Sequence, residues 1–155
     1  ELQYLIIHCT ATREGQEISS DTIRKWHTAP PPQGRGWKQV GYSDIVHLDG
    51  TIENFVSYDE DKWVEGGEIT NGATGYNSVS RHVVYVGGVA KDGKTAKDTL
   101  TNEQFESLKS YIQIFLNNHP NAKVIGHNQV SPKACPSFKV NEKFSEIIPK
   151  RNLIF

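Results

Sequence analysis

Two histidines and one cysteine are the residues of this chain whose types and positions point most clearly to chemistry. His8 directly follows the apolar run YLII, and His127 directly follows the run KVIG. Functional sites are usually built at strand ends in sheets with helical crossovers. If these two runs are parallel strands, both imidazoles lie at one edge of the sheet. Cys135 comes eight residues after His127, in the run SPKACPS, whose prolines restrict the backbone around the thiol.

His8, His127 and Cys135 are three ligands of the types that bind zinc. Zinc held by three protein residues keeps its fourth position for water or substrate, whereas a structural site has four protein ligands. Bound zinc lowers the pKa of its water to about 7, so a hydroxide suited to attack on an amide carbonyl forms at neutral pH. The residues therefore predict one catalytic Zn²⁺ per chain. A metal-independent hydrolase, with Cys135 as nucleophile and His127 as base, is the alternative, although it leaves His8 without a role.

Cys9 is the second cysteine, and its place next to His8 indicates a different environment. Side chains alternate between the two faces of a strand, so Cys9 points to the core if His8 points to the site. We therefore expect Cys9 to be a buried thiol. By number alone, a disulfide between Cys9 and Cys135 is a second possibility.

Apolar and turn patterns predict a mixture of strands and helices. The expected strands are Leu2–Ile7, the hairpin Tyr42–Leu48 and Thr51–Val56 around Asp49-Gly50, His82–Val86 and Lys123–Ile125. The expected helices begin at Ser19–Asp21, at the capping box Thr101–Gln104 and at Val140, the last one running to Ile148. Residues 57–80 are expected to form a long loop. The mixture indicates an α/β fold, a single domain over residues 1–155 with a mixed central β-sheet flanked by helices.

Charge and hydropathy narrow the class of protein further. The 155 residues include 17 basic and 18 acidic side chains, so the basic excess of a nucleic-acid-binding protein is missing. We expect no nucleic-acid partner. No apolar run approaches the roughly 20 residues of a membrane span, so no membrane insertion is expected. The chain has no methionine and begins at Glu1, directly before an apolar run, and we expect this N-terminus to be trimmed.

Six runs of residues follow one another along the chain: IIHCTAT (6–12), VGYSDIV (40–46), DGTIE (49–53), GYN (75–77), VGG (86–88) and GHNQVSPKACPSF (126–138). Together they resemble the zinc N-acetylmuramoyl-L-alanine amidases of the phage-lysozyme and peptidoglycan-recognition-protein type, the type 2 amidases. The HCTAT, VGY and PKACPSF runs are the specific ones. The resemblance extends from Leu2 to about Phe144.

The resemblance implies a fold, an activity and a set of site residues. The family folds as a mixed sheet flanked by helices and cleaves the amide between N-acetylmuramic acid and the L-alanine of the stem peptide. The implied partner is peptidoglycan or a muropeptide. The family's zinc ligands fall on His8, His127 and Cys135, and its active-site tyrosine and lysine fall on Tyr42 and Lys133. A cation or O–H donor in these places would stabilise charge on the carbonyl oxygen.

The chain departs from the family pattern between Asn71 and His82, a segment that normally lines the substrate groove. Relatives often carry a histidine where this chain has Gly72, and the usual Asn-Ser-hydrophobic-Gly sequence is missing. We hypothesise that Arg81 and His82 are replacement contacts for a stem-peptide carboxylate. The alternative is a cross-strand charge and a packed imidazole. Trp37 is a further candidate for substrate binding, because aromatic rings beside a groove stack on sugars or peptides, and the alternative is a loop anchor.

A non-catalytic peptidoglycan-binding module on the same fold is the second function that the resemblance allows. Binding-only members typically lack the cysteine ligand, so the presence of Cys135 favours the enzyme. The expected location is the cell envelope or periplasm, the extracellular space, or the cytoplasm in the case of a phage lysin.

Overall fold

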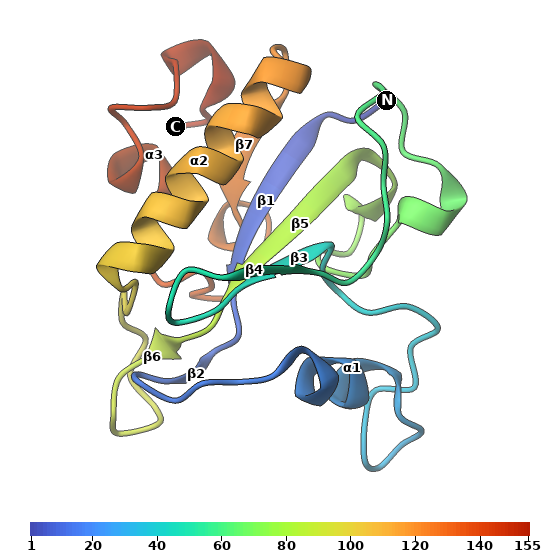
Figure 1. Ribbon diagram of the computed structural model, residues 1–155, viewed down its shortest axis with the longest axis vertical. Helices are drawn as coiled ribbons and strands as arrows, with labels where there is room; N and C mark the ends of the chain where they lie inside the picture. The colour runs from blue at the N-terminus through green and yellow to red at the C-terminus, as the bar shows by residue number, and fades with distance from the viewer.

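The computed structural model describes residues 1–155 and has a five-stranded sheet at its centre. The strands lie in the order β4-β3-β5-β1-β7 (Figure 1). β3, β5, β1 and β7 are parallel and β4 is antiparallel to β3, so the predicted mixed sheet is confirmed. The bounds are β1 Tyr4–Cys9, β3 Asp44–Val46, β4 Ile52–Asn54, β5 Ser80–Tyr85 and β7 Lys123–Gly126.

Helix α2 (Asn102–Asn118) crosses one face of this sheet (Figure 1). Leu108, Ile112 and Phe115 lie on one side of the helix and pack in the main core against residues of β1, β5 and β7. Burial of each such side chain stabilises the fold by about 1.5–3 kcal/mol. The predicted capping box is present: Thr101 Oγ1 accepts a hydrogen bond from the Gln104 N–H, and Gln104 Oε1 accepts one from the Thr101 N–H. The N–H groups of Thr101 and Gln104, which have no partner within the helix, are therefore both hydrogen-bonded.

Helix α1 (Ser20–Thr28) belongs to a second core on the other face of the sheet. Its N-cap is Ser19, as predicted, and the Ser19 side chain accepts a hydrogen bond from the Thr22 N–H. Ile23 of α1 packs there with Ile45 of β3 and Val84 of β5. Because side chains alternate along β1 and β5, one face of the sheet turns toward α2 and the other toward α1.

Several elements are shorter or longer than the sequence patterns predict. β1 extends to Cys9, β5 begins at Ser80, and the hairpin strands are only three residues each. Helix α3 covers only Val140–Lys143, and a series of turns follows it. Phe144 and Ile148 are nevertheless buried in the main core, as helical spacing from Val140 predicts. Burial thus follows the apolar pattern even where regular helix geometry does not continue.

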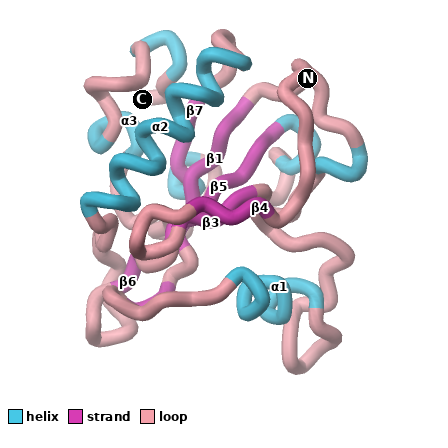
Figure 2. Tube along the Cα trace, in the orientation of Figure 1, coloured by secondary structure: helices cyan, strands magenta, loops and turns pink.

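Much of the chain between these elements is irregular (Figure 2). The expected loop over residues 57–80 is confirmed up to the start of β5 and contains two short 3₁₀ turns, η1 (Gly66–Glu68) and η2 (Asn77–Val79). Two further 3₁₀ turns are η3 (His127–Gln129) and η4 (Lys150–Asn152). A two-stranded sheet of β2 (Thr12–Arg13) and β6 (Gly88–Val89) was not expected from the sequence. None of the helices has the length and apolarity needed to cross a membrane.

Candidate active site

The predicted ligands His8, His127 and Cys135 come together at the carboxyl ends of β1 and β7. One ligand atom from each residue lies within 4.8 Å of the other two. Ile7 pairs with Gly126 between the parallel strands, so the two histidines leave neighbouring strands at the same level. Their ring centroids are 4.7 Å apart. The prediction that both imidazoles lie at one edge of the sheet is confirmed.

The loop that carries Cys135 is held against β1 and β5 by hydrogen bonds. The Cys9 N–H donates to Cys135 Sγ over 3.1 Å, so the end of β1 points a donor at the sulfur. The Tyr85 hydroxyl donates to the Pro136 carbonyl over 2.7 Å. These bonds at Cys135 and at the next residue, Pro136, hold the thiol beside His8 without help from a ligand. The site is therefore largely preorganised.

The spacing of the donor atoms fits a tetrahedral zinc ion. Zn–S and Zn–N bonds of about 2.3 and 2.0–2.1 Å at a tetrahedral angle require an S···N separation of about 3.6 Å. Cys135 Sγ lies 3.8 Å from His8 Nδ1. The donor set of two imidazoles and one sulfur is one that zinc prefers, and it leaves one position for water or substrate. The residues present therefore fit the metal.

Electrostatics keeps the two histidines in the neutral form that binds a cation. Burial lowers the pKa of His8 well below its usual value, with His82 and His127 adding to the effect. Burial and the charge of Lys133 lower the pKa of His127. Because a metal ligand must be deprotonated, both imidazoles are ready to bind metal at neutral pH.

The same site does not favour a metal-independent cysteine nucleophile. The neighbouring Cys9 side chain and burial raise the pKa of Cys135 above its usual value. His8 Nδ1 lies 3.8 Å from the sulfur. A reactive cysteine needs a lowered pKa and a closely bonded base. The arrangement suits a thiol that a cation converts to thiolate.

The ligands line a pocket with a cavity volume of about 370 Å³. Tyr42, Lys133 and Trp37, all expected at the site from the sequence, line it as well. The Tyr42 ring lies 5.1 Å from the His8 ring, measured between centroids. Burial, and to a smaller extent the two cysteines, raise the pKa of Tyr42, so its phenol stays protonated near neutral pH. Tyr42 is therefore placed to donate a hydrogen bond next to the ligand cluster.

Helix α1 and the loop after it supply a wall that the sequence did not reveal. His27, Trp26 and Arg35 line the pocket. The Gly41 N–H donates to His27 Nδ1 over 2.9 Å, and a Cβ at Gly41 would lie 2.9 Å from His27 Cε1. The glycine therefore allows the imidazole to pack against the backbone just before Tyr42. In the sequence, Trp26 and His27 follow the helix start at helical spacing, which by itself indicates packing of one helix face and not a place at a pocket.

Arg81 does not line the pocket, which corrects the hypothesis of a substrate contact. It lies on the α2 side of β5, is only 6% exposed, and pairs with Glu60 over 3.3 Å. Its guanidinium also lies 3.7 Å from the centroid of the Tyr58 ring. Strand alternation is the reason, because Val83 and Tyr85 of the same strand face the main core. The alternative reading, a structural charge, agrees with this placement.

His82 lies on the site face of β5 but is completely buried. The hypothesis that His82 contacts the substrate directly is therefore corrected as well. His82 Nδ1 is 2.8 Å from His8 Nε2. The imidazole therefore contacts the predicted ligand His8 and is itself covered from solvent. Asn71 and Gly72, from the segment that departs from the family pattern, line the pocket themselves.

Cys9 has the environment that strand alternation predicts. It is 4% exposed and belongs to the main core. Both cysteines are free thiols, so the disulfide alternative does not describe this structure. A Cβ at Gly88 would lie 2.4 Å from Cys9 Sγ, which shows how closely β6 packs on the thiol.

A larger hollow of about 520 Å³ lies at the other end of β1, around residues 1–4 and 118–123. Its histidine, His119, already bonds Glu60 over 3.1 Å. It contains none of the predicted ligands. The volume of a cavity therefore does not identify the active site here. The active site is identified by the cluster of titratable residues in the smaller pocket.

Comparisons with known proteins agree with this fold and site. Residues 1–138 match the family described as N-acetylmuramoyl-L-alanine amidase. The chain is 36% identical over 134 residues to the endolysin of Escherichia phage T7, a match that covers 86% of this chain and 80% of the relative. It resembles the structure of the Ph2119 endolysin from a Thermus scotoductus bacteriophage, with a TM-score of 0.70, 21% identity and coverage of 94% and 84%. It also resembles human PGRP-IBETAC in complex with glycosamyl muramyl pentapeptide, with a TM-score of 0.68, 19% identity and coverage of 99% and 86%.

The fold and the site define a mixed-sheet hydrolase with a His-His-Cys cluster at the sheet edge. The chain belongs to the N-acetylmuramoyl-L-alanine amidase family. It is an enzyme that hydrolyses the amide bond between N-acetylmuramic acid and L-alanine in peptidoglycan. Cys135, whose presence in the sequence favours an enzyme, belongs to the group of residues that could hold a metal ion.

Proposed function

We propose that this amidase depends on one zinc ion held by His8, His127 and Cys135. The observation that carries the proposal is the convergence of the three ligand atoms within 4.8 Å at the pocket. When bound, zinc would supply a Lewis acid for the amide carbonyl and an activated water molecule. The neutral imidazoles and the N–H directed at Cys135 Sγ support this donor set.

Tyr42 and Lys133 are the residues that we propose to act on the reacting amide. The Lys133 side chain is exposed at the pocket rim, and its positive charge acts on His127 and His8. An ammonium there stabilises negative charge that develops on the carbonyl oxygen. Tyr42 remains a phenol because its pKa is raised, so it donates a hydrogen bond and does not act as a phenolate base. Both side chains reach the pocket from loops that the sheet holds in place.

The substrate that we propose is the bacterial cell wall, as the relationship to phage endolysins suggests. Trp37, Trp26 and Arg35 line the pocket together with the predicted ligands. The Arg35 guanidinium lies 5.1 Å from the centroid of the Trp37 ring, so apolar and cationic surfaces adjoin. Such a wall suits a peptide stem that carries carboxylates next to aliphatic side chains.

Mass spectrometry of the products from purified peptidoglycan tests the proposal. We expect free stem peptides and peptide-free glycan, lost when the enzyme is treated with a chelator and regained when zinc is added. Soluble muropeptides assayed in parallel report whether polymer or fragment is preferred. Activity that persists in protein shown to be free of metal would refute the zinc proposal.

Variants separate ligands from the residues that act on the amide. His8→Ala, His127→Ala and Cys135→Ala should lose both zinc and cleavage. Tyr42→Phe and Lys133→Met should retain zinc and lose about 10²–10³-fold in kcat, the usual effect of removing one stabilising donor. Full activity in either of the last two would show that the residue has no part in the reaction.

A further inference from the structure

The buried His82 imidazole has no role in the chemistry described so far, yet it touches a metal ligand. His82 Nδ1 lies 2.8 Å from His8 Nε2, and both rings are buried. The contact follows from register, because Ile6 of β1 pairs with His82 of β5, and His8 lies two residues further along the same face. We propose that His82 is a positioning residue that holds His8 in the orientation and tautomer needed for the metal.

The hydrogen bonds around His82 define one direction of proton donation. His8 Nδ1 is the nitrogen that faces Cys135 Sγ, at 3.8 Å, so Nδ1 is the metal-binding atom and Nε2 carries the proton. The His8 Nε2–H then donates to His82 Nδ1. His82 must carry its own proton on Nε2, which lies 3.1 Å from Asn77 Oδ1, an atom that can only accept.

Asn77 completes the chain and is itself fixed by the backbone. Its Oδ1 also accepts a hydrogen bond from the Ala73 N–H over 2.9 Å. That second contact identifies the atom as the oxygen, because an amide nitrogen facing the same N–H would clash donor against donor. The chain therefore runs from His8 through His82 to Asn77 and ends on the backbone of the loop before β5.

The loop before β5 leaves room for this imidazole. A Cβ at Gly72 would lie 2.4 Å from His82 Nδ1 and 2.6 Å from His82 Cγ. Any side chain at residue 72 would therefore displace the ring or be displaced by it. Gly72 and His82, which both lie in the segment that departs from the family pattern, are thus explained by one packing arrangement.

A partner of this kind acts on the metal through the ligand. Outer hydrogen bonds orient a ligating imidazole and raise its basicity, and their loss typically weakens metal binding by 10–100-fold. Replacing His82 with leucine would leave the His8 Nε2–H buried without an acceptor. The inference rests on the metal site proposed above, so zinc binding by the unaltered enzyme is measured first.

Zinc affinity by chelator competition tests the role of His82 apart from activity. We expect His82→Leu to raise the zinc Kd by 10–100-fold and to change the absorption spectrum of the Co²⁺-substituted protein. His82→Asn should restore most of the affinity, because its Oδ1 can occupy the place of the imidazole Nδ1. His119→Leu is the matched control, since His119 is also buried and hydrogen-bonded but lies away from the site, and its zinc Kd should not change.

The possible results distinguish failure of the proposed zinc site from failure of the proposed role of His82. If the unaltered enzyme binds no zinc, the proposed function fails and this inference fails with it. If it binds zinc and His82→Leu binds equally well with an unchanged Co²⁺ spectrum, only the role of His82 is refuted. If His82→Leu does not fold, NMR of the ¹⁵N-labelled histidines in the zinc-loaded enzyme decides. We expect both His8 and His82 to be protonated on Nε2, and a His82 protonated on Nδ1 would overturn the proposal.

Discussion

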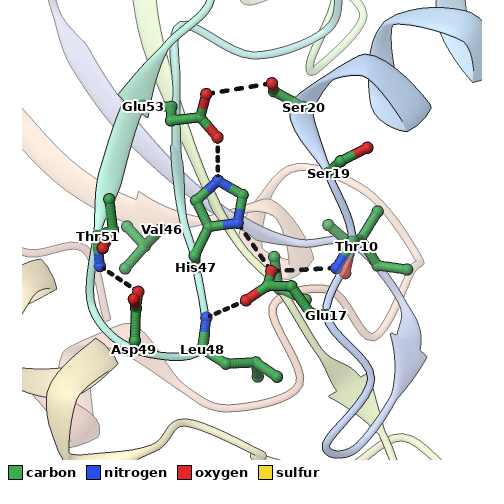
Figure 3. A network of polar contacts seen from close by, with 12 residues as sticks. Thr10, Glu17, Ser19, Ser20, Val46, His47, Leu48, Asp49, Thr51 and Glu53 are labelled. Atoms are coloured by element: carbon green, nitrogen blue, oxygen red, sulfur yellow. Dashed lines mark hydrogen bonds and ion pairs between the residues drawn. The ribbon is translucent and has the colours of Figure 1, made fainter.

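His47 joins the β3–β4 hairpin to the segment before α1, and its contacts predict a specific dependence of stability on pH. Figure 3 shows the His47 imidazole between the carboxylates of Glu17 and Glu53. Glu17 Oε1 lies 2.8 Å from His47 Nδ1, and Glu53 Oε1 lies 2.5 Å from His47 Nε2. Glu53 also accepts a hydrogen bond from the Ser20 hydroxyl of α1. A protonated His47 donates to both carboxylates, whereas a neutral one can donate to only one.

The sign of the effect follows from the shift in pKa. Burial alone would lower the pKa of His47, but hydrogen bonds to Glu17 and Glu53 outweigh it and raise the pKa above its usual value of about 6.5. A raised pKa in the folded state stabilises the fold fully below about pH 6.5, and this stabilisation is lost as pH rises through the folded-state pKa.

The magnitude is limited by solvent around the two glutamates. Hydrogen bonds to charged groups contribute about 1.5–3 kcal/mol each when well buried. The Glu17 and Glu53 side chains are 50% and 48% exposed, which reduces the contribution of the pair to about 1–2 kcal/mol. In a protein of this size that corresponds to a Tm change of roughly 2–8 °C.

Thermal unfolding of the enzyme and of His47→Gln, followed from about pH 7 to about pH 9, checks this prediction. Glutamine has no titratable group here, so the difference in Tm between the two proteins isolates His47. His8, His27, His82 and His127 have lowered pKa values and are neutral over this range, so they cancel in the difference. We expect the unaltered enzyme to lose its advantage as pH rises. Parallel Tm curves for the two proteins would refute the reasoning.

Three further predictions concern residues around the site. Gly72→Ala should weaken zinc binding and lower Tm, because its Cβ would lie 2.4 Å from His82 Nδ1, and chelator competition and calorimetry measure the two effects. Arg81→Ala should lower the free energy of unfolding by about 1–3 kcal/mol, since the buried guanidinium pairs with a half-exposed Glu60, while kcat/KM for muropeptides stays unchanged. A changed stem-peptide preference in that variant would restore a substrate role. Cys9→Ala should retain zinc and activity and lose about 1–2 kcal/mol of stability in urea unfolding, and loss of zinc would show that the wrong thiol is assigned as ligand.

Local patterns in the sequence were sufficient for many features of this enzyme. The ligand types, the apolar runs before His8 and His127, and the capping box at Thr101 each depend on a few neighbouring residues. The opposite orientations of His8 and Cys9 follow from the two-residue period of a strand. The predicted strands, the capping box and the burial of Cys9 were confirmed because covalent geometry and backbone hydrogen bonding act over short distances. The assignment of the metal ligands stays a prediction.

The tertiary structure decided which distant residues meet at the site. No local pattern places His82 next to His8, which lies 74 positions earlier in the chain, because that contact depends on the parallel pairing of β1 with β5. The same holds for His27, which reaches the pocket only because α1 packs beside the loop that carries Tyr42. Sheet order and register are set by the burial of many side chains at once, so they follow from the packed core and not from any single segment.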